Sequence, residues 1–116
     1  MSRFTDHAGR PLVAVTGIGI VTPLGLGVAD NWAALTAGRS GIRRITRFPT
    51  EHLRTTIAGT VELPGEDTGA MTSSQRVARY ATLVAEEALA QAGFGPGNFP
   101  GPLMLGMPPV ETEWPY

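Results

Sequence analysis

Cysteine and lysine are both absent from this sequence of 116 residues, and all nine basic residues are arginine. Without a thiol, these residues cannot form a disulfide, a zinc–thiolate site or a cysteine nucleophile. Without lysine they cannot form a phosphate-binding P-loop, which depends on a lysine side chain. The formal net charge is only -1, so the totals favour neither nucleic acid nor an anionic membrane as a partner.

Long apolar runs are missing as well. None approaches the length of a transmembrane helix, and residues 1–7 lack the apolar stretch of a signal peptide. Hydrophobic residues make up 42% of the chain and charged residues 16%, as is typical of a soluble globular protein. We therefore expect a cytoplasmic protein that binds neither membranes nor nucleic acid.

The length suits one domain and is too short for two. Residues 1–10 are polar and predict a flexible N-terminal arm, whereas residues 11–116 predict α/β structure. Residues 107–116 contain three prolines and predict no finished element, and the candidate core side chains are few for a complete domain. We therefore expect these residues to be part of a larger domain.

A strand, a turn and a helix are expected first. Residues 12–16 are rich in β-branched side chains, as in a parallel strand buried on both faces. Residues 28–37 predict a helix whose core-facing side carries Val28, Trp32 and Leu35, with Gly38 as its C-cap. The turn between them is marked by Gly17, Gly19, Pro23 and Gly25. This order predicts the start of a βαβ crossover.

Residues 39–72 form a long excursion with little periodicity, in which only residues 56–61 predict a strand. An excursion of this length is unusual in a compact domain, so we expect other parts of a larger protein to cover it. Its arginines at positions 43, 44 and 47 could meet an acidic partner, although solvation of a loop is the favoured interpretation.

The second helix carries the clearest pattern. Hydroxyl side chains at residues 72–74 can cap its start, and Gly93 can end it. Its opposite face carries Glu86 and Glu87, which we expect to be solvated. Residues 102–106 then predict a second buried strand. The apolar stripe that faces the core consists of Val77, Tyr80, Ala81, Val84, Ala88 and Ala92.

Nucleotide and metal sites are the other candidates. Gly17 and Gly19 follow a predicted strand, but the dinucleotide fingerprint needs a third glycine where Thr22 stands. We favour a structural turn there and keep a nucleotide-binding α/β module as an alternative. His7 and His52 have no Asp, Glu or Cys at metal-ligand spacing, so no metal site is expected and both should be solvated.

Several segments, taken in order, are similar to one enzyme family. Residues 13–25 (VAVTGIGIVTPLG) resemble the opening strand and turn of elongating β-ketoacyl-acyl-carrier-protein synthases. Residues 32–35 (WAAL) and 38–42 (GRSGI) resemble the helix and turn that follow in that family. The spacing of residues 58–61 and the Ala-Gly at the end of the second helix continue the similarity to about residue 106.

The resemblance implies the N-terminal part of a thiolase-like fold, ordered as strand, helix, long excursion, helix and strand. It implies a decarboxylating Claisen condensation in which a cysteine takes an acyl group from a carrier protein. Two histidines and a lysine support decarboxylation of the malonyl thioester. These catalytic residues would follow residue 116, so none is assigned here.

The resemblance also implies partners. No cofactor is expected, because phosphopantetheine arrives on the acyl carrier protein. The protein is expected to work as a homodimer, or as a heterodimer with another ketosynthase. A non-catalytic partner subunit of the chain-length-factor type is the alternative function.

Two segments depart from the family pattern. A glycine-rich loop that borders the acyl pocket in the family is reduced here to Gly106, and we predict an acyl-pocket gate at Met107, Pro109 and Val110. Proline would stiffen that gate. The basic cluster that precedes the second helix in the family is also missing. Arg76 and Arg79 are the residues predicted to dock the carrier protein.

Overall fold

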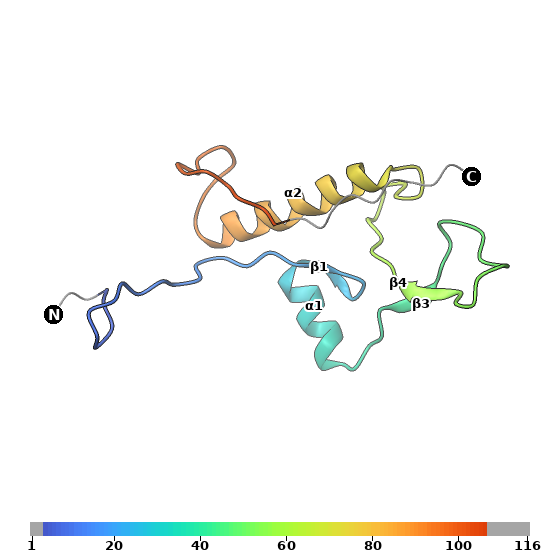
Figure 1. Ribbon diagram of the computed structural model, residues 1–116, viewed down its shortest axis with the longest axis horizontal. Helices are drawn as coiled ribbons and strands as arrows, with labels where there is room; N and C mark the ends of the chain where they lie inside the picture. The colour runs from blue at the N-terminus through green and yellow to red at the C-terminus, as the bar shows by residue number, and fades with distance from the viewer. Residues whose placement is uncertain (1–3, 107–116) are drawn as a thin grey trace.

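The computed structural model describes residues 4–106 and contains two helices and two small antiparallel strand pairs (Figure 1). The elements follow one another in the order β1, β2, α1, β3, β4 and α2. Helix, long excursion and helix therefore occur in the predicted order. The strands predicted on either side of this series are not formed.

The first predicted strand is wrong as a buried strand. Residues 12–16 pair with no other strand in the described part of the chain. Val13 is 94% exposed and Val15 is 81% exposed. A strand buried on both faces needs a neighbour on each side and a covering layer above and below, and residues 4–106 supply neither to this segment.

A short hairpin takes the place of the predicted turn. β1 (Val21–Thr22) pairs antiparallel with β2 (Gly25–Leu26), and the Thr22 hydroxyl accepts a hydrogen bond from the Leu24 amide at 3.0 Å. Beyond β1 and β2, the Gly27 amide donates to the Ile20 carbonyl at 2.8 Å. The chain thus reverses around Pro23 and leads directly into the first helix.

Helix α1 (Gly27–Thr36) confirms the first predicted helix, and Gly38 confirms its left-handed C-cap with a φ of 66°. The predicted inward face is wrong. Trp32 is 66% exposed and Leu35 is 61% exposed, whereas Asn31 and Ala34 are buried. Helical spacing groups residues on one face, but it does not determine which face meets the rest of the protein.

The excursion contains a second hairpin. β3 (Ile42–Arg44) pairs antiparallel with β4 (Ile57–Gly59), with Arg44 opposite Ile57. β4 falls inside the strand predicted over residues 56–61, which confirms it in part. The partner strand was not predicted, because two of its three residues are arginines and it carries no apolar alternation.

Helix α2 (Ser73–Gln91) confirms the second predicted helix. Thr72 and Gln75 form a reciprocal capping box at its start, and Gly93 takes a left-handed φ of 87° beyond its end. Its predicted apolar stripe lies half-buried on the inner side. Within residues 4–106, neither helix is long and apolar enough to span a bilayer.

The last predicted strand is also wrong within the described residues. Residues 102–106 form no strand, and Met104 is 90% exposed. The preceding turn is confirmed, since Gly97 has a φ of 74° and the Asn98 amide donates to the Gly95 carbonyl at 3.1 Å. As for residues 12–16, the described residues provide no strand beside this segment.

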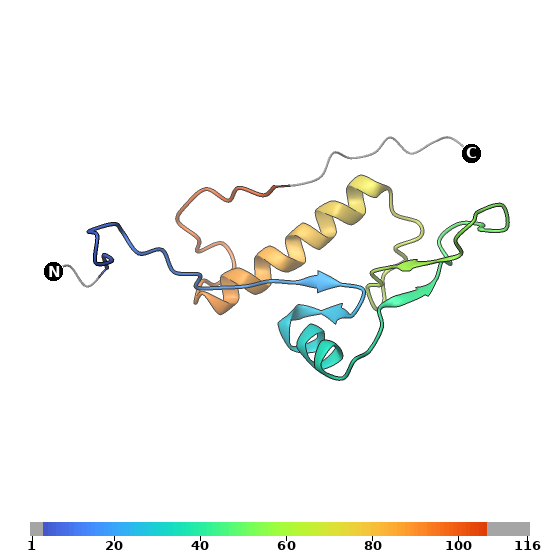
Figure 2. The same ribbon diagram turned by 60° about the horizontal axis from the view of Figure 1, so that its bottom comes forward.

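The two helices lie on opposite sides of the extended segment that leads into β1 (Figures 1 and 2). The buried core is small, because Ala34 and Leu63 are the buried hydrophobic residues of the described part. The Cα radius of gyration is 18.6 Å, whereas a compact domain of this length has about 13 Å. The described residues therefore do not enclose a core of their own.

Candidate functional site

A polar cluster joins α2 to the glycine segment and to the start of α1. The Glu87 carboxylate accepts hydrogen bonds from the Ile20 amide at 2.9 Å and from the Val28 amide at 2.7 Å. One turn later, Gln91 Oε1 accepts from the Ile18 amide at 2.6 Å. The prediction that Glu87 is a solvated surface residue is therefore wrong.

The carboxylate of Glu87 meets the N-terminal end of α1. A negative charge is favourable there, because the first amides of a helix have no partner within the helix and carry a partial positive charge. Glu87 supplies that partner to Val28, although 59 residues separate the two. No local sequence pattern identifies such a contact.

Gly17 and Gly19 allow α2 to approach the extended segment backbone to backbone. A Cβ at Gly17 would lie 1.9 Å from the Ala88 carbonyl oxygen, and a Cβ at Gly19 would lie 1.8 Å from that of Val84. Either side chain would force the helix away. Both glycines therefore accommodate the close approach of α2, and their predicted role as turn residues stays a prediction.

A hydrogen bond between Thr22 and Asn31 links the β1–β2 hairpin to α1. The Thr22 hydroxyl donates to Asn31 Oδ1. Asn31 Nδ2 donates to the Gly25 and Gly27 carbonyls, each at 2.8 Å. Asn31 is only 7% exposed, so these bonds satisfy an amide that burial would otherwise leave unpaired.

This geometry removes the basis of the nucleotide-binding alternative. A phosphate bound after the first strand would need free amides from the glycine segment and from the start of the helix. The Ile18, Ile20 and Val28 amides are all bonded to side chains of α2. Thr22 stands where the fingerprint would require a third glycine, and its hydroxyl donates to Asn31 of α1.

Pro23 and Gly25 connect the hairpin to its neighbours. A Cβ at Gly41 would lie 2.7 Å from Pro23 Cβ, and the Pro23 carbonyl accepts a hydrogen bond from Arg43 Nη2 at 3.1 Å. A Cβ at Gly25 would lie 2.7 Å from Asp30 Cβ. The two strand pairs thus meet at Pro23, and all four predicted turn residues have tight neighbours.

Arg76 and Arg79 both contact the loop that precedes α2. Arg79 makes a bidentate pair with Glu66, with Nη2–Oε1 at 2.7 Å and Nε–Oε2 at 3.1 Å. The hydrogen bond from Arg79 lowers the pKa of Glu66, and the same bond raises the pKa of Arg79. Arg76 donates to the Thr68 and Met71 carbonyls. Carrier-protein docking by these two arginines stays a prediction.

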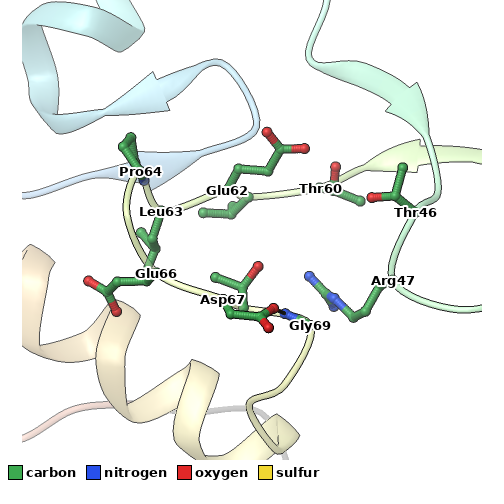
Figure 3. A pocket seen from close by; sticks show the side chains of 11 residues that line it. Thr46, Arg47, Thr60, Glu62, Leu63, Pro64, Glu66, Asp67 and Gly69 are labelled. Carbon is green, nitrogen blue, oxygen red and sulfur yellow. Dashed lines mark hydrogen bonds between the residues drawn. The ribbon is translucent and has the colours of Figure 1, made fainter.

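A pocket of about 530 Å³ lies between the β3–β4 pair and this loop (Figure 3). Arg47 enters it from one side, and Asp67 lies on the facing wall. None of its lining residues is a histidine, a serine or a cysteine. The lining residues are Thr46, Arg47, Thr60, Val61, Glu62, Leu63, Pro64, Glu66, Asp67, Thr68 and Gly69.

The remaining predicted residues divide into two groups. His7 and His52 are exposed, as predicted, and the described residues contain no cluster of three potential metal ligands. The predicted gate residues Met107, Pro109 and Val110 lie outside the described residues. The acyl-pocket gate therefore stays a prediction.

Comparisons with known proteins identify relatives for almost the whole chain. Residues 11–106 match the family described as the N-terminal domain of beta-ketoacyl synthase. The chain is 40% identical over 91 residues to the tetracenomycin polyketide synthase ketoacyl synthase beta subunit of Streptomyces glaucescens. It is 38% identical over 96 residues to the alpha subunit of the same synthase.

These alignments cover 72% and 79% of this chain, but only 22% of each relative. A 3-oxoacyl-[acyl-carrier-protein] synthase 2 from Coxiella burnetii is 51% identical over 49 residues, which are 42% of this chain and 12% of that protein. No solved structure matches at a significant level. The chain thus spans about a fifth of the length of the two Streptomyces glaucescens subunits.

Proposed function

This chain belongs to the β-ketoacyl synthase family, and from that premise we propose that the complete protein condenses acyl and malonyl thioesters in polyketide or fatty-acid synthesis. The continuous match over residues 11–106 carries the proposal. It is supported by relatives named as polyketide ketoacyl synthase subunits and as a 3-oxoacyl-[acyl-carrier-protein] synthase.

In the proposed reaction, a cysteine thiolate displaces the carrier thiol and becomes acylated. The malonyl thioester then loses carbon dioxide, and the resulting carbanion attacks the acyl carbon and releases the cysteine. No residue between 4 and 106 is assigned a step in this chemistry. Phosphopantetheine takes part as the arm of the carrier-bound substrates, and no separate cofactor is proposed.

We assign residues 11–106 a structural role in the N-terminal half of a thiolase-like fold. The contacts at Glu87, Gly17 and Gly19 support this role, because they hold two helices against one extended segment. The exposed valines of residues 12–16 and the exposed Met104 would be covered by further strands and helices of that half.

A non-catalytic partner subunit is the second candidate. The identities to the tetracenomycin alpha and beta subunits, 38% and 40%, are too similar to separate the two roles. Those subunit names support a heterodimer, and a homodimer is the other proposed assembly. A cytoplasmic location is proposed for either assembly. In this second candidate the fold would shape an acyl pocket without a nucleophile of its own.

The test uses the complete protein, purified alone and after co-expression with a ketosynthase subunit from the same organism. Each sample is incubated with acyl- and malonyl-carrier protein, and mass spectrometry follows the β-ketoacyl product and any acyl adduct on this chain. An adduct together with product is the expected result. Product without an adduct on this chain would assign it the partner role, and absence of product from every pairing would overturn both candidates.

A further inference from the structure

One hydroxyl of the excursion directly follows a pair of arginines. Residues 43–46 read Arg-Arg-Ile-Thr, and Thr46 is the one serine or threonine of the sequence with two arginines among the three residues before it. Neither the fold nor the proposed reaction makes use of this arrangement. Paired arginines just before a hydroxyl are typical of the substrates of arginine-directed protein kinases, whose clefts present carboxylates to the guanidinium groups.

The Thr46 hydroxyl is accessible and has no partner. Thr46 is exposed, and its side chain makes no hydrogen bond within residues 4–106. Two other hydroxyls of the excursion differ in this respect. Thr50 is only 6% exposed, and Ser40 Oγ accepts a hydrogen bond from the Ile42 amide at 3.1 Å. Thr46 can therefore meet a reacting group without the loss of any contact.

The backbone around Thr46 is extended and lies at an open edge. Thr46 directly follows β3, which pairs only with β4 within the described residues. The Ile45 amide donates to the Thr56 carbonyl at 2.9 Å, and the loop that joins the two strands begins beyond this bond. Figures 1 and 2 both show this loop projecting away from the two helices. Another protein could therefore enclose the end of β3 and Thr46 without meeting a helix.

Both arginines of the pair can contact such a protein. Arg44 is exposed and makes no ion pair or side-chain hydrogen bond in residues 4–106. Arg43 lies 3.5 Å from Glu62, yet 45% of its side chain is exposed. Guanidinium groups bind carboxylates in bidentate geometry. The acidic residues elsewhere in the chain oppose this recognition little, since salt screens exposed charges that are more than about 10 Å apart.

We propose that Thr46 is a phosphorylation site for an arginine-directed serine/threonine kinase. In this step the Thr46 hydroxyl oxygen attacks the γ-phosphorus of ATP, the bond from that phosphorus to the bridging oxygen breaks, and ADP leaves. The hydroxyl proton passes to the catalytic aspartate of the kinase. The inference goes beyond the proposed function and does not depend on it, because it applies equally to a catalytic subunit and to a non-catalytic partner.

The phosphate would change the charge of the pocket that Thr46 lines. Three carboxylates line this pocket as well, those of Glu62, Glu66 and Asp67. The phosphate adds a charge of about -1.5 to -2, which these carboxylates would repel. Arg47 enters the same pocket next to Thr46 and makes no ion pair in the described residues (Figure 3). We therefore expect the guanidinium of Arg47 to bind the phosphate.

The test incubates the folded, complete protein with magnesium ATP and the catalytic subunit of cyclic-AMP-dependent protein kinase, an arginine-directed enzyme. Mass spectrometry should place one phosphate on Thr46, and Thr46→Val should abolish it. Arg44→Gln should slow the modification about tenfold through the loss of one charge-assisted contact. The matched control is Arg39→Gln, which removes another exposed, unpaired arginine outside the motif and should change the rate less than about twofold.

A peptide of residues 39–54 separates the sequence pattern from its setting in the protein. Modification of this peptide but not of the complete protein would overturn the inference, because the rest of the protein would then cover Thr46. Phosphate on Ser40, Thr55 or Thr56 in place of Thr46 would overturn it as well. Unmodified Thr46→Val should condense thioesters as the parent does, so a failed condensation would contradict the proposed function alone.

The native organism provides the last measurement. The complete protein purified from it at successive stages of growth should carry phosphate on Thr46 in a fraction of the molecules. Absence of this phosphate at every stage would overturn the inference.

Discussion

Glu87 holds together three segments that are distant in the sequence, and its substitution offers the sharpest test of the structure at the scale of one residue. Glu87→Ala would leave the Ile20 and Val28 amides without their acceptor. Loss of partners for partly buried amides costs about 1–3 kcal/mol each in the free energy of unfolding. With two amides affected, we expect the complete protein to lose at least about 2 kcal/mol in total, measured by chemical denaturation.

The matched control for Glu87 is its neighbour. Glu86 is exposed and makes no hydrogen bond in the described residues, so Glu86→Ala should change the free energy of unfolding by less than about 0.5 kcal/mol. Equal losses in the two variants would show that the contacts of Glu87 are not formed in the complete protein.

The pair between Glu66 and Arg79 makes a prediction about pH. Because the pKa of Glu66 is lowered below its ordinary value of 4.5, folding favours the ionised carboxylate. The stabilisation is therefore present above pH 4.5, and it is lost as the pH falls through the lowered value. Thermal unfolding of the complete protein from pH 7 down to pH 3 should show a smaller acid-induced decrease in Tm for Glu66→Gln than for the parent.

Both partners of that pair are partly exposed, so the effect should be modest and should weaken in high salt. Arg79→Gln provides the reciprocal variant and should flatten the same part of the pH profile. If Glu66→Gln and the parent lose Tm in parallel between pH 5 and pH 3, the ion pair does not contribute to stability.

At the scale of the elements, the capping box of α2 can be tested directly. Thr72 accepts from the Gln75 amide at 3.2 Å, and the Gln75 side chain accepts from the Thr72 amide at 2.8 Å. Thr72→Ala removes the first bond and should lower the free energy of unfolding by about 1 kcal/mol. Ser74→Ala, inside the first turn, should change it by less than about 0.5 kcal/mol in the same denaturation experiment. A larger loss from Ser74→Ala would place the helix start elsewhere.

The helices could be predicted from the sequence because their signals are local. A cap and a following glycine identified the two ends of α2, and Gly38 identified the end of α1. The strands could not be predicted in the same way. Residues 12–16 have strand-like composition, but pairing depends on neighbours that composition does not specify.

The same distinction applies to the candidate site. The glycine turn was identified because Gly and Pro restrict the backbone locally. The sequence predicts that Glu87 is solvated, because its two partners lie 59 and 67 residues away and no local pattern reveals them. Helical spacing predicts Trp32 in the core, because it shows which residues share one face of the helix. Which part of the protein packs against that face depends on the whole fold, and Trp32 is exposed here.

At the scale of the whole molecule, the distribution of apolar surface predicts how this polypeptide behaves by itself. Two hydrophobic residues are buried in the described part, while Val13, Val15 and Met104 are at least 81% exposed. Exposed apolar area of this kind promotes association, and a small core cannot offset the entropy of ordering the backbone. We therefore expect residues 1–116 alone to aggregate or to form a molten state.

The expected observations for this polypeptide are helical far-UV circular dichroism, binding of the dye ANS and a broad thermal transition. The complete protein is the matched comparison and should melt cooperatively without binding the dye. This difference is expected because the helices around Glu87 need a further covering layer. A sharp transition that does not depend on concentration, from a monomer that excludes ANS, would mean that residues 1–116 bury a core of their own and would contradict their placement within a larger ketosynthase domain.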